Sequence, residues 1–209
     1  MTTAPTGVDR NLLRDSLSQW PSGVAVVTTM DSGGVRRGFT ATAFSSLSMD
    51  PPLVLVCLDR GADCRPAFAT ADAMAVHLLR DDQAQLARRF ATKNIDKYDG
   101  LPTSEGLCGV PLLGGVLARI ECVLDRRIDA GDHVILVGLV HRCEVFAGRP
   151  LVYFARAFHG LQTGAHSSQA RKADTHAHDE RDAHNSVGAR DGRRTTDGHH
   201  AGGGRGQDS

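Results

Sequence analysis

The 209-residue sequence lacks several features that mark common protein classes. It has no apolar run of the roughly 18 residues that a helix needs to cross a bilayer. Its five cysteines include no CxxC pair, so we predict neither a disulfide framework nor a zinc site. It also contains no HExxH, GxSxG or GxGxxG motif. None of these motifs therefore points to a metal, a protein nucleophile or a dinucleotide-binding loop.

Aromatic residues are few, and all ten lie between Trp20 and Phe158. Residues 163–209 contain one Val and no Leu or Ile, but eight of the 23 glycines and six of the ten histidines. Such a segment has too little apolar surface to offset the entropy lost on ordering. We predict a disordered tail over 163–209, a flexible N-terminus over 1–8, and one domain over 9–162.

Excess charge of either sign is also absent. The chain has 24 basic and 24 acidic residues, and the tail contains seven of each. A balanced domain has no electrostatic footprint for nucleic acid or for an anionic membrane, so neither is a predicted partner.

The N-terminus has no basic start followed by an apolar stretch, and we expect a cytoplasmic protein. Cys57, Cys122 and Cys143 lie among Val, Leu and Ile, which predicts buried free thiols.

Short runs of β-branched and apolar residues, separated by Gly, Asp and Pro, dominate the domain. Strand–helix–strand alternation does not recur, so the prediction is a mainly β, antiparallel barrel with a few peripheral helices. The expected elements are helices at 8–20 (capped by Asp9) and 83–92 (capped by Asp81, Asp82 and Gln83), a short turn or helix at 65–71, strands at 24–29, 35–44, 53–58, 74–79, 116–128, 133–146 and 150–155, and a Gly- and Pro-rich loop at 93–115. The strand at 53–58 is apolar on both faces, which predicts a central position.

Residues 38–52 are the most unusual stretch. Thr40 and Thr42 share one face of a predicted strand, and three serines follow at 45, 46 and 48. Small side chains leave the main chain accessible, and short hydroxyls add donors and acceptors. Such a surface suits a flat heterocycle with hydrogen-bonding edges and a phosphate. A half-exposed strand that runs into a Ser-rich turn has the same composition, so the residues alone leave both readings open.

The same stretch carries a family resemblance. Residues 38–58 read GFTATAFSSLSMDPPLVLVCL and resemble the signature of the short-chain flavin reductases, the reductase components of two-component flavin monooxygenases. Three further segments agree in order and spacing, namely LARRFA at 86–91, GDH at 131–133 and PLVYF at 150–154. The resemblance covers residues 10–161, which is nearly all of the predicted domain.

This resemblance implies a split β-barrel that forms a homodimer and binds FMN or FAD at the subunit interface. NADH or NADPH would reduce the flavin, and the reduced flavin would leave to serve a monooxygenase. The resemblance gives His133 as the catalytic candidate, near the nicotinamide. The candidate cofactor-binding residues are Thr40, Ala41, Thr42, Ser45, Ser46, Leu47, Ser48, Cys57, Phe90, Ala91, Lys97, Tyr153 and Arg156. Ser45–Ser48 correspond to a turn in the family.

Several of these residues have a second reading. A histidine after Gly-Asp also serves as a turn-end cap, so His133 keeps both roles open. Lys97 and Tyr98 are candidates to reach the flavin phosphate or adenine, but a lysine after a helix is more often simply solvated. Phe90 either packs near the flavin or belongs to the buried helix face, which is the favoured reading. Arg156 either meets a nucleotide phosphate or has no such role.

Two positions depart from the family pattern. The loop 59–64 has Ala62 and Cys64 where the family offers Ser or Thr to the phosphate, and Arg60 or Arg65 are the candidate replacements. His77 stands where the family often has Asn, and we predict a buried histidine with satisfied hydrogen bonds.

The predicted function is an NAD(P)H:flavin oxidoreductase that supplies reduced flavin to a partner monooxygenase. One alternative is a non-catalytic flavin carrier or electron-transfer protein on the same barrel. Another is a split-barrel oxidase that acts on a pyridoxine phosphate, which would need a stronger cationic phosphate clamp than the sequence offers. The choice between FAD and FMN, and the choice between NADH and NADPH, stay open.

Overall fold

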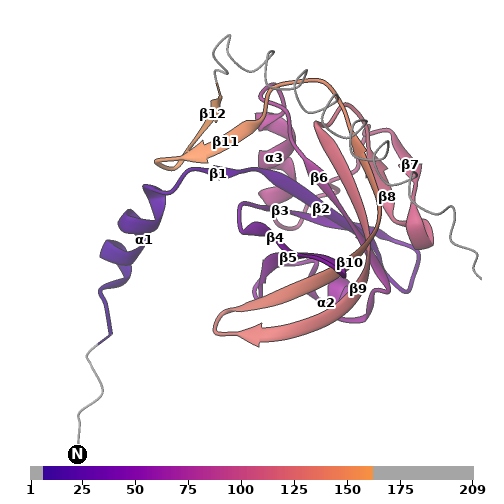
Figure 1. Ribbon diagram of the computed structural model, residues 1–209, viewed down its shortest axis with the longest axis horizontal. Helices are drawn as coiled ribbons and strands as arrows, with labels where there is room; N and C mark the ends of the chain where they lie inside the picture. The colour runs from indigo at the N-terminus through magenta and orange to yellow at the C-terminus, as the bar shows by residue number, and fades with distance from the viewer. Residues whose placement is uncertain (1–6, 162–209) are drawn as a thin grey trace, which may run out of the picture. The chain divides into compact units, whose positions relative to one another are not determined.

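The computed structural model describes residues 7–161 (Figure 1). The predicted tail over 163–209 lies outside the described residues, as does most of the predicted flexible N-terminus, and the domain boundaries stay predictions. In chain order the elements are α1 (Arg10–Ser18), β1 (Ser22–Gly23), β2 (Ala25–Met30), β3 (Arg36–Ala41), β4 (Phe44–Met49), β5 (Pro52–Asp59), α2 (Arg65–Thr70), β6 (Ala73–Leu78), α3 (Ala84–Ala91), β7 (Thr103–Glu105), the 3-10 turn η1 (Leu107–Gly109), β8 (Pro111–Leu113), β9 (Ala118–Ala130), β10 (His133–Val145), β11 (Leu151–Phe154) and β12 (Ala157–Gly160).

Seven strands form one antiparallel sheet in the order β3-β2-β6-β9-β10-β5-β4. Its two end strands, β3 and β4, follow each other in the chain and are joined only by Thr42 and Ala43. β9 and β10 form the longest hairpin of the sheet (Figure 1). Strands β1, β11 and β12 make a second small sheet, and β7 pairs with β8. This arrangement confirms the prediction of a mainly β, antiparallel fold with a few helices, and it is consistent with a split barrel.

Strands β2 and β6 are buried on both faces. On β2, Val27 faces the main core of the sheet, whereas Val26 packs with Phe90 of α3 on the other side. On β6, Ala75 is covered by Val110 and Leu112, which belong to the segment predicted as a loop. The strand predicted to be central, β5, instead lies next to the end strand β4, and its burial alternates. That prediction was wrong because an apolar run does not reveal which face a neighbouring element covers.

Several local predictions need correction. The segment 93–115 contains β7, η1 and β8 rather than one irregular loop. Helix α3 follows Gln83, whose side chain makes no cap bond, while Asp81 pairs with Arg149 and Asp82 with Arg80. The predicted strand 35–44 ends at Ala41, and Phe44 begins β4.

Helix α1 begins as predicted, because the Asp9 carboxylate accepts hydrogen bonds from the main-chain N–H groups of Asn11 and Leu12. No residue of α1 is buried, however. Leu17 and Trp20 are 65% and 75% exposed, so the apolar side of this segment has no partner within residues 7–161. Within these residues, the helices are too short or too polar to span a bilayer.

The cysteines are all free, but their burial differs from the prediction. Cys122 is buried, and burial raises the pKa of its thiol to about 12. Cys57 is half-buried and Cys143 is exposed. The prediction for Cys143 was wrong because it lies at the outer end of β10, where the strand runs past the core.

Candidate functional site

A cavity of about 250 Å³ lies where β3, β5, the end of α3 and the start of β10 meet. We call it the β3–β5 cavity. It is lined by Phe39, Thr40, Ala41, Thr42, Ala43, Cys57, Leu58, Asp59, Ala62, Asp63, Phe90, Ala91, Lys93, Lys97 and His133. The structure thus brings together eight of the predicted site residues, namely Thr40, Ala41, Thr42, Cys57, Phe90, Ala91, Lys97 and His133. Because β3 is an end strand, one of its main-chain edges has no strand partner in the described chain.

The other predicted residues lie elsewhere. Ser45–Ser48 belong to strand β4, where most side chains are exposed, and not to a turn. Tyr153 of β11 packs on Phe158, with ring centroids 5.3 Å apart. Arg156, in the turn after β11, forms an ion pair with Asp15 of α1. None of these lines the β3–β5 cavity, and their roles toward flavin stay predictions.

Thr40 and Gly38 fix α3 on the outer face of β3. The Thr40 hydroxyl donates a 2.6 Å hydrogen bond to the main-chain oxygen of Ala87. Its proton is thereby used, and the oxygen can serve a ligand only as an acceptor. At Gly38 an added Cβ would lie 2.8 Å from the ring of Phe90 and 2.8 Å from the carbonyl oxygen of Val27. Phe90 is 1% exposed, so it is a core residue as favoured, and it also lines the cavity.

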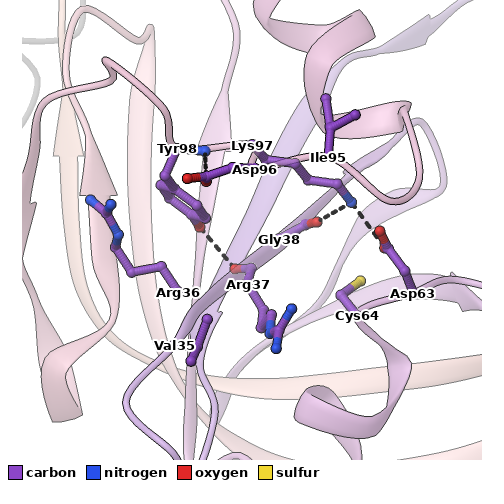
Figure 2. Close-up of a pocket in the computed structure, with 10 residues that line it drawn as sticks. All are labelled: Val35, Arg36, Arg37, Gly38, Asp63, Cys64, Ile95, Asp96, Lys97 and Tyr98. Atoms are coloured by element: carbon purple, nitrogen blue, oxygen red, sulfur yellow. Dashed lines mark hydrogen bonds and ion pairs between the residues drawn. The ribbon is translucent and has the colours of Figure 1, made fainter.

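Lys97 is not solvated. Its ammonium donates to the carbonyl oxygen of Gly38 and to the carboxylate of Asp63, each at 3.0 Å (Figure 2). Burial acts to raise the pKa of Asp63, but hydrogen bonds from Lys97 and the Asn94 N–H, together with the lysine charge, hold that pKa below its usual value. Lys97 therefore ties β3 to the loop after β5, and its charge is balanced by Asp63.

A second cavity, of about 290 Å³, shares Lys97 and Asp63 with the β3–β5 cavity (Figure 2). Its polar groups are largely engaged with one another. The Tyr98 hydroxyl donates a 2.8 Å hydrogen bond to the carbonyl oxygen of Arg37, and the Arg36 guanidinium lies 4.8 Å from the ring centroid of Tyr98. Tyr98 is buried here, outside the β3–β5 cavity, and burial raises its pKa. Lys97 and Tyr98 thus bind the carbonyl groups of Gly38 and Arg37 on β3.

His133 is the first residue of β10 and stands opposite Asp59 of β5. Its Nδ1 lies 2.7 Å from the carboxylate of Asp132, and its side chain is 43% exposed at the cavity. The hydrogen bond from His133, followed by its charge, lowers the pKa of Asp132. The ring thus bonds a carboxylate, and its Nε2 is left for a ligand.

The candidate replacements in the phosphate loop lie away from this cavity. Arg60 forms a 2.6 Å ion pair with Asp129, and Arg65 lines a different cavity beside Phe68. Lys93, which sequence reasoning did not single out, lines the β3–β5 cavity and donates a 2.8 Å hydrogen bond to the carbonyl oxygen of Gly61. Its only sequence signal is a position two residues past the end of α3, where a lysine is usually solvated.

His77 confirms the prediction of a buried, satisfied histidine. It is fully buried, with Nδ1 3.1 Å from the carbonyl oxygen of Val26 and Nε2 accepting from the Leu113 N–H at 3.1 Å. Because the Leu113 N–H needs an acceptor, the ring is neutral and carries its proton on Nδ1. Burial lowers its pKa to about 4. His77 joins β2, β6 and β8 and takes no part in the site.

Residues 17–162 match the family model of the flavin reductase like domain. The chain belongs to this family. Actinorhodin polyketide dimerase of Streptomyces coelicolor is 45% identical over 158 residues, which are 75% of this chain and 89% of that protein. HsaB of Rhodococcus jostii, the reductase subunit of a flavin-dependent monooxygenase, is 33% identical over 160 residues, which are 76% of this chain and 82% of that protein.

A solved structure of the NADH:FAD oxidoreductase SgcE6 of Streptomyces globisporus, in complex with NAD and FAD fragments, superposes with a TM-score of 0.71. It is 33% identical and covers 75% of this chain and 95% of that one. These matches confirm the predicted family and its split barrel. They also confirm the predicted enzyme class, an NAD(P)H-dependent flavin reductase with flavin and a nicotinamide nucleotide as its cofactors.

Proposed function

We propose that this flavin reductase binds FMN or FAD in the β3–β5 cavity, reduces it with NADH or NADPH, and releases reduced flavin to a partner flavin-dependent monooxygenase. The strongest support for flavin binding in this cavity is the set of residues that line it. The end of β3 with the Thr42–Ala43 link that follows it, and His133 of β10, line one cavity, although they lie 90 or more positions apart in the sequence. HsaB, a reductase subunit, gives the precedent for the partner.

The residues of the cavity fit a flavin. Its walls include Ala41, Ala43, Ala62 and Ala91, whose short side chains leave room for a flat ring. Main-chain groups at the edge of β3 and the Thr40 oxygen offer hydrogen-bonding positions along one side. Cavities that recognise small molecules combine such apolar walls with a few polar groups.

A bound flavin supplies a hydride acceptor, and hydride transfer is chemistry of the two cofactors rather than of the protein. The chain's own part is to bind and orient. Asp132 holds the Nδ1 proton of His133 and so fixes the ring at the mouth of the cavity. From there His133 Nε2 can accept a hydrogen bond from a ligand when the ring is neutral, or donate one when it is protonated.

The proposal includes a homodimer. About 250 Å³ is less than the roughly 300–1,000 Å³ of cavities that enclose a whole ligand, so one chain leaves part of a flavin uncovered. Leu17 and Trp20 of the α1 segment are exposed and apolar, as are Leu47 and Met49 of β4. A second copy on these surfaces would bury them and add a wall to the site. Ser45–Ser48 on β4 would then lie near that interface.

Cytoplasmic localisation is also part of the proposal. It is supported by five free thiols, which a reducing compartment preserves.

Oxidation of NADH and of NADPH by the purified protein tests the function, with and without added FMN or FAD. We expect nucleotide oxidation that depends on flavin, and loss of the flavin absorbance when oxygen is excluded. Tight flavin binding without any reduction would contradict the reductase and favour the flavin carrier.

A further inference from the structure

The positive charges around the β3–β5 cavity are not equivalent. Lys97 is 7% exposed and is neutralised by Asp63, and Arg60 is paired with Asp129 on the β9–β10 hairpin. Lys93 is exposed and makes its one hydrogen bond to a carbonyl oxygen, Gly61 O. In the described part of the chain, no carboxylate lies within ion-pair distance of its ammonium group. Lys93 is therefore the cation of this cavity whose charge is left for a ligand.

The loop opposite Lys93 offers little else to an anion. Residues 59–64 contain no Ser or Thr, and the Cys64 thiol is 2% exposed. The N–H of Gly61 already donates a 2.6 Å hydrogen bond to Asp59. An anionic group at this end of the cavity therefore has few other donors, and a lysine would give it a charge-assisted hydrogen bond.

Lys93 can reach such a group without rearrangement of the main chain. Its flexible stem places the ammonium beside Gly61, 3.6 Å from where a Cβ on that glycine would lie, and a lysine binds phosphate as a mobile point charge. Its present bond to a neutral carbonyl is easily exchanged for a charge-assisted one. The carboxylate of Asp59 also flanks Gly61 and offsets part of the lysine's field.

We propose that Lys93 binds the phosphate of the flavin nucleotide and so makes the site selective for FMN or FAD over riboflavin. This inference rests on the proposed function, because it needs flavin in the β3–β5 cavity. It assigns a role to a residue of this chain that lies outside the family motifs quoted above.

The test compares the affinity of FMN and riboflavin, which differ by the phosphate, by quenching of flavin fluorescence. For Lys93→Gln we expect the Kd of FMN to rise about tenfold and that of riboflavin to change less than about twofold. Lys93→Arg should restore most of the FMN affinity, and added salt should narrow the gap between FMN and riboflavin.

Arg89→Gln is the matched control. Arg89 is exposed near the same end of α3 and also donates to a carbonyl oxygen, that of Asp99 at 3.0 Å, but it does not line the cavity. The Kd of FMN for Arg89→Gln should stay within about twofold of the wild-type value. An equal weakening of FMN and riboflavin by Lys93→Gln, or an unchanged FMN affinity, would overturn the role of Lys93 while leaving the reductase intact. Failure of the wild-type protein to bind either flavin would overturn both proposals.

Discussion

The buried ring of His77 should make the stability of this protein depend on pH. Its pKa is about 4 in the folded chain and 6.5 as the ordinary value. Between those values the unfolded chain binds more protons than the folded chain, so the free energy of unfolding falls as the pH drops. The stability that depends on a neutral His77 ring is fully present above pH 6.5 and is lost as the pH falls toward 4. From pH 7 to pH 5 the loss is about 2 kcal/mol.

Urea unfolding at a series of pH values measures this loss. With an m-value of about 2 kcal/mol/M, the midpoint for the wild-type protein should fall by about 1 M of urea between pH 7 and pH 5. The variant His77→Asn keeps an amide donor and acceptor but has no group that titrates in this range. Its midpoint should fall by about 1 M less than that of the wild-type protein. The test compares how steeply the urea midpoint of each protein changes with pH, so a loss of stability in the variant that is the same at every pH does not affect it. Parallel pH dependences of the two proteins would refute the account of His77.

Three further predictions concern the site and its assembly. His133→Ala should lower kcat/KM for NADH by at least about tenfold, because it removes the ring at the cavity mouth. Unchanged kinetics would remove His133 from the site. FMN at about ten times its own Kd should slow the alkylation of Cys57 about tenfold. As internal controls, the exposed Cys143 should react at the same rate with and without FMN, and the buried Cys122 should stay unreactive. Equal Cys57 rates with and without FMN would place the flavin elsewhere. Leu17→Glu should convert the dimer to a monomer in light scattering, because it places a charge on the exposed apolar side of α1. A wild-type monomer, or a variant that stays dimeric, would contradict the proposed interface.

Most of the helices and strands could be predicted because local sequence patterns determine them. The β2–β3 hairpin follows from a β-branched run and a second extended run around a Gly-rich turn, and Asp9 caps α1 as its position indicates. The burial of the strands could not be predicted in the same way. The segment 93–115 looks like a loop by composition, yet it supplies Val110 and Leu112, which cover β6. Such coverage depends on contacts between residues far apart in the chain.

The sequence likewise predicts only those parts of the candidate site that lie close together in the chain. Thr40, Ala41 and Thr42 lie on one strand, and the family motif points to them directly. The neutralisation of Lys97 by Asp63 depends on two loops 34 residues apart, which no spacing rule identifies. Lys93 was missed because a lysine after a helix is ordinarily solvated, and only the fold brings it beside Gly61.

A crystal structure of the protein with FMN tests the central claim most directly. The account predicts the flavin ring in the β3–β5 cavity, against Ala41 and within reach of His133, with its phosphate beside Lys93. A flavin bound in the other cavity, against Arg36 and Tyr98, would contradict it.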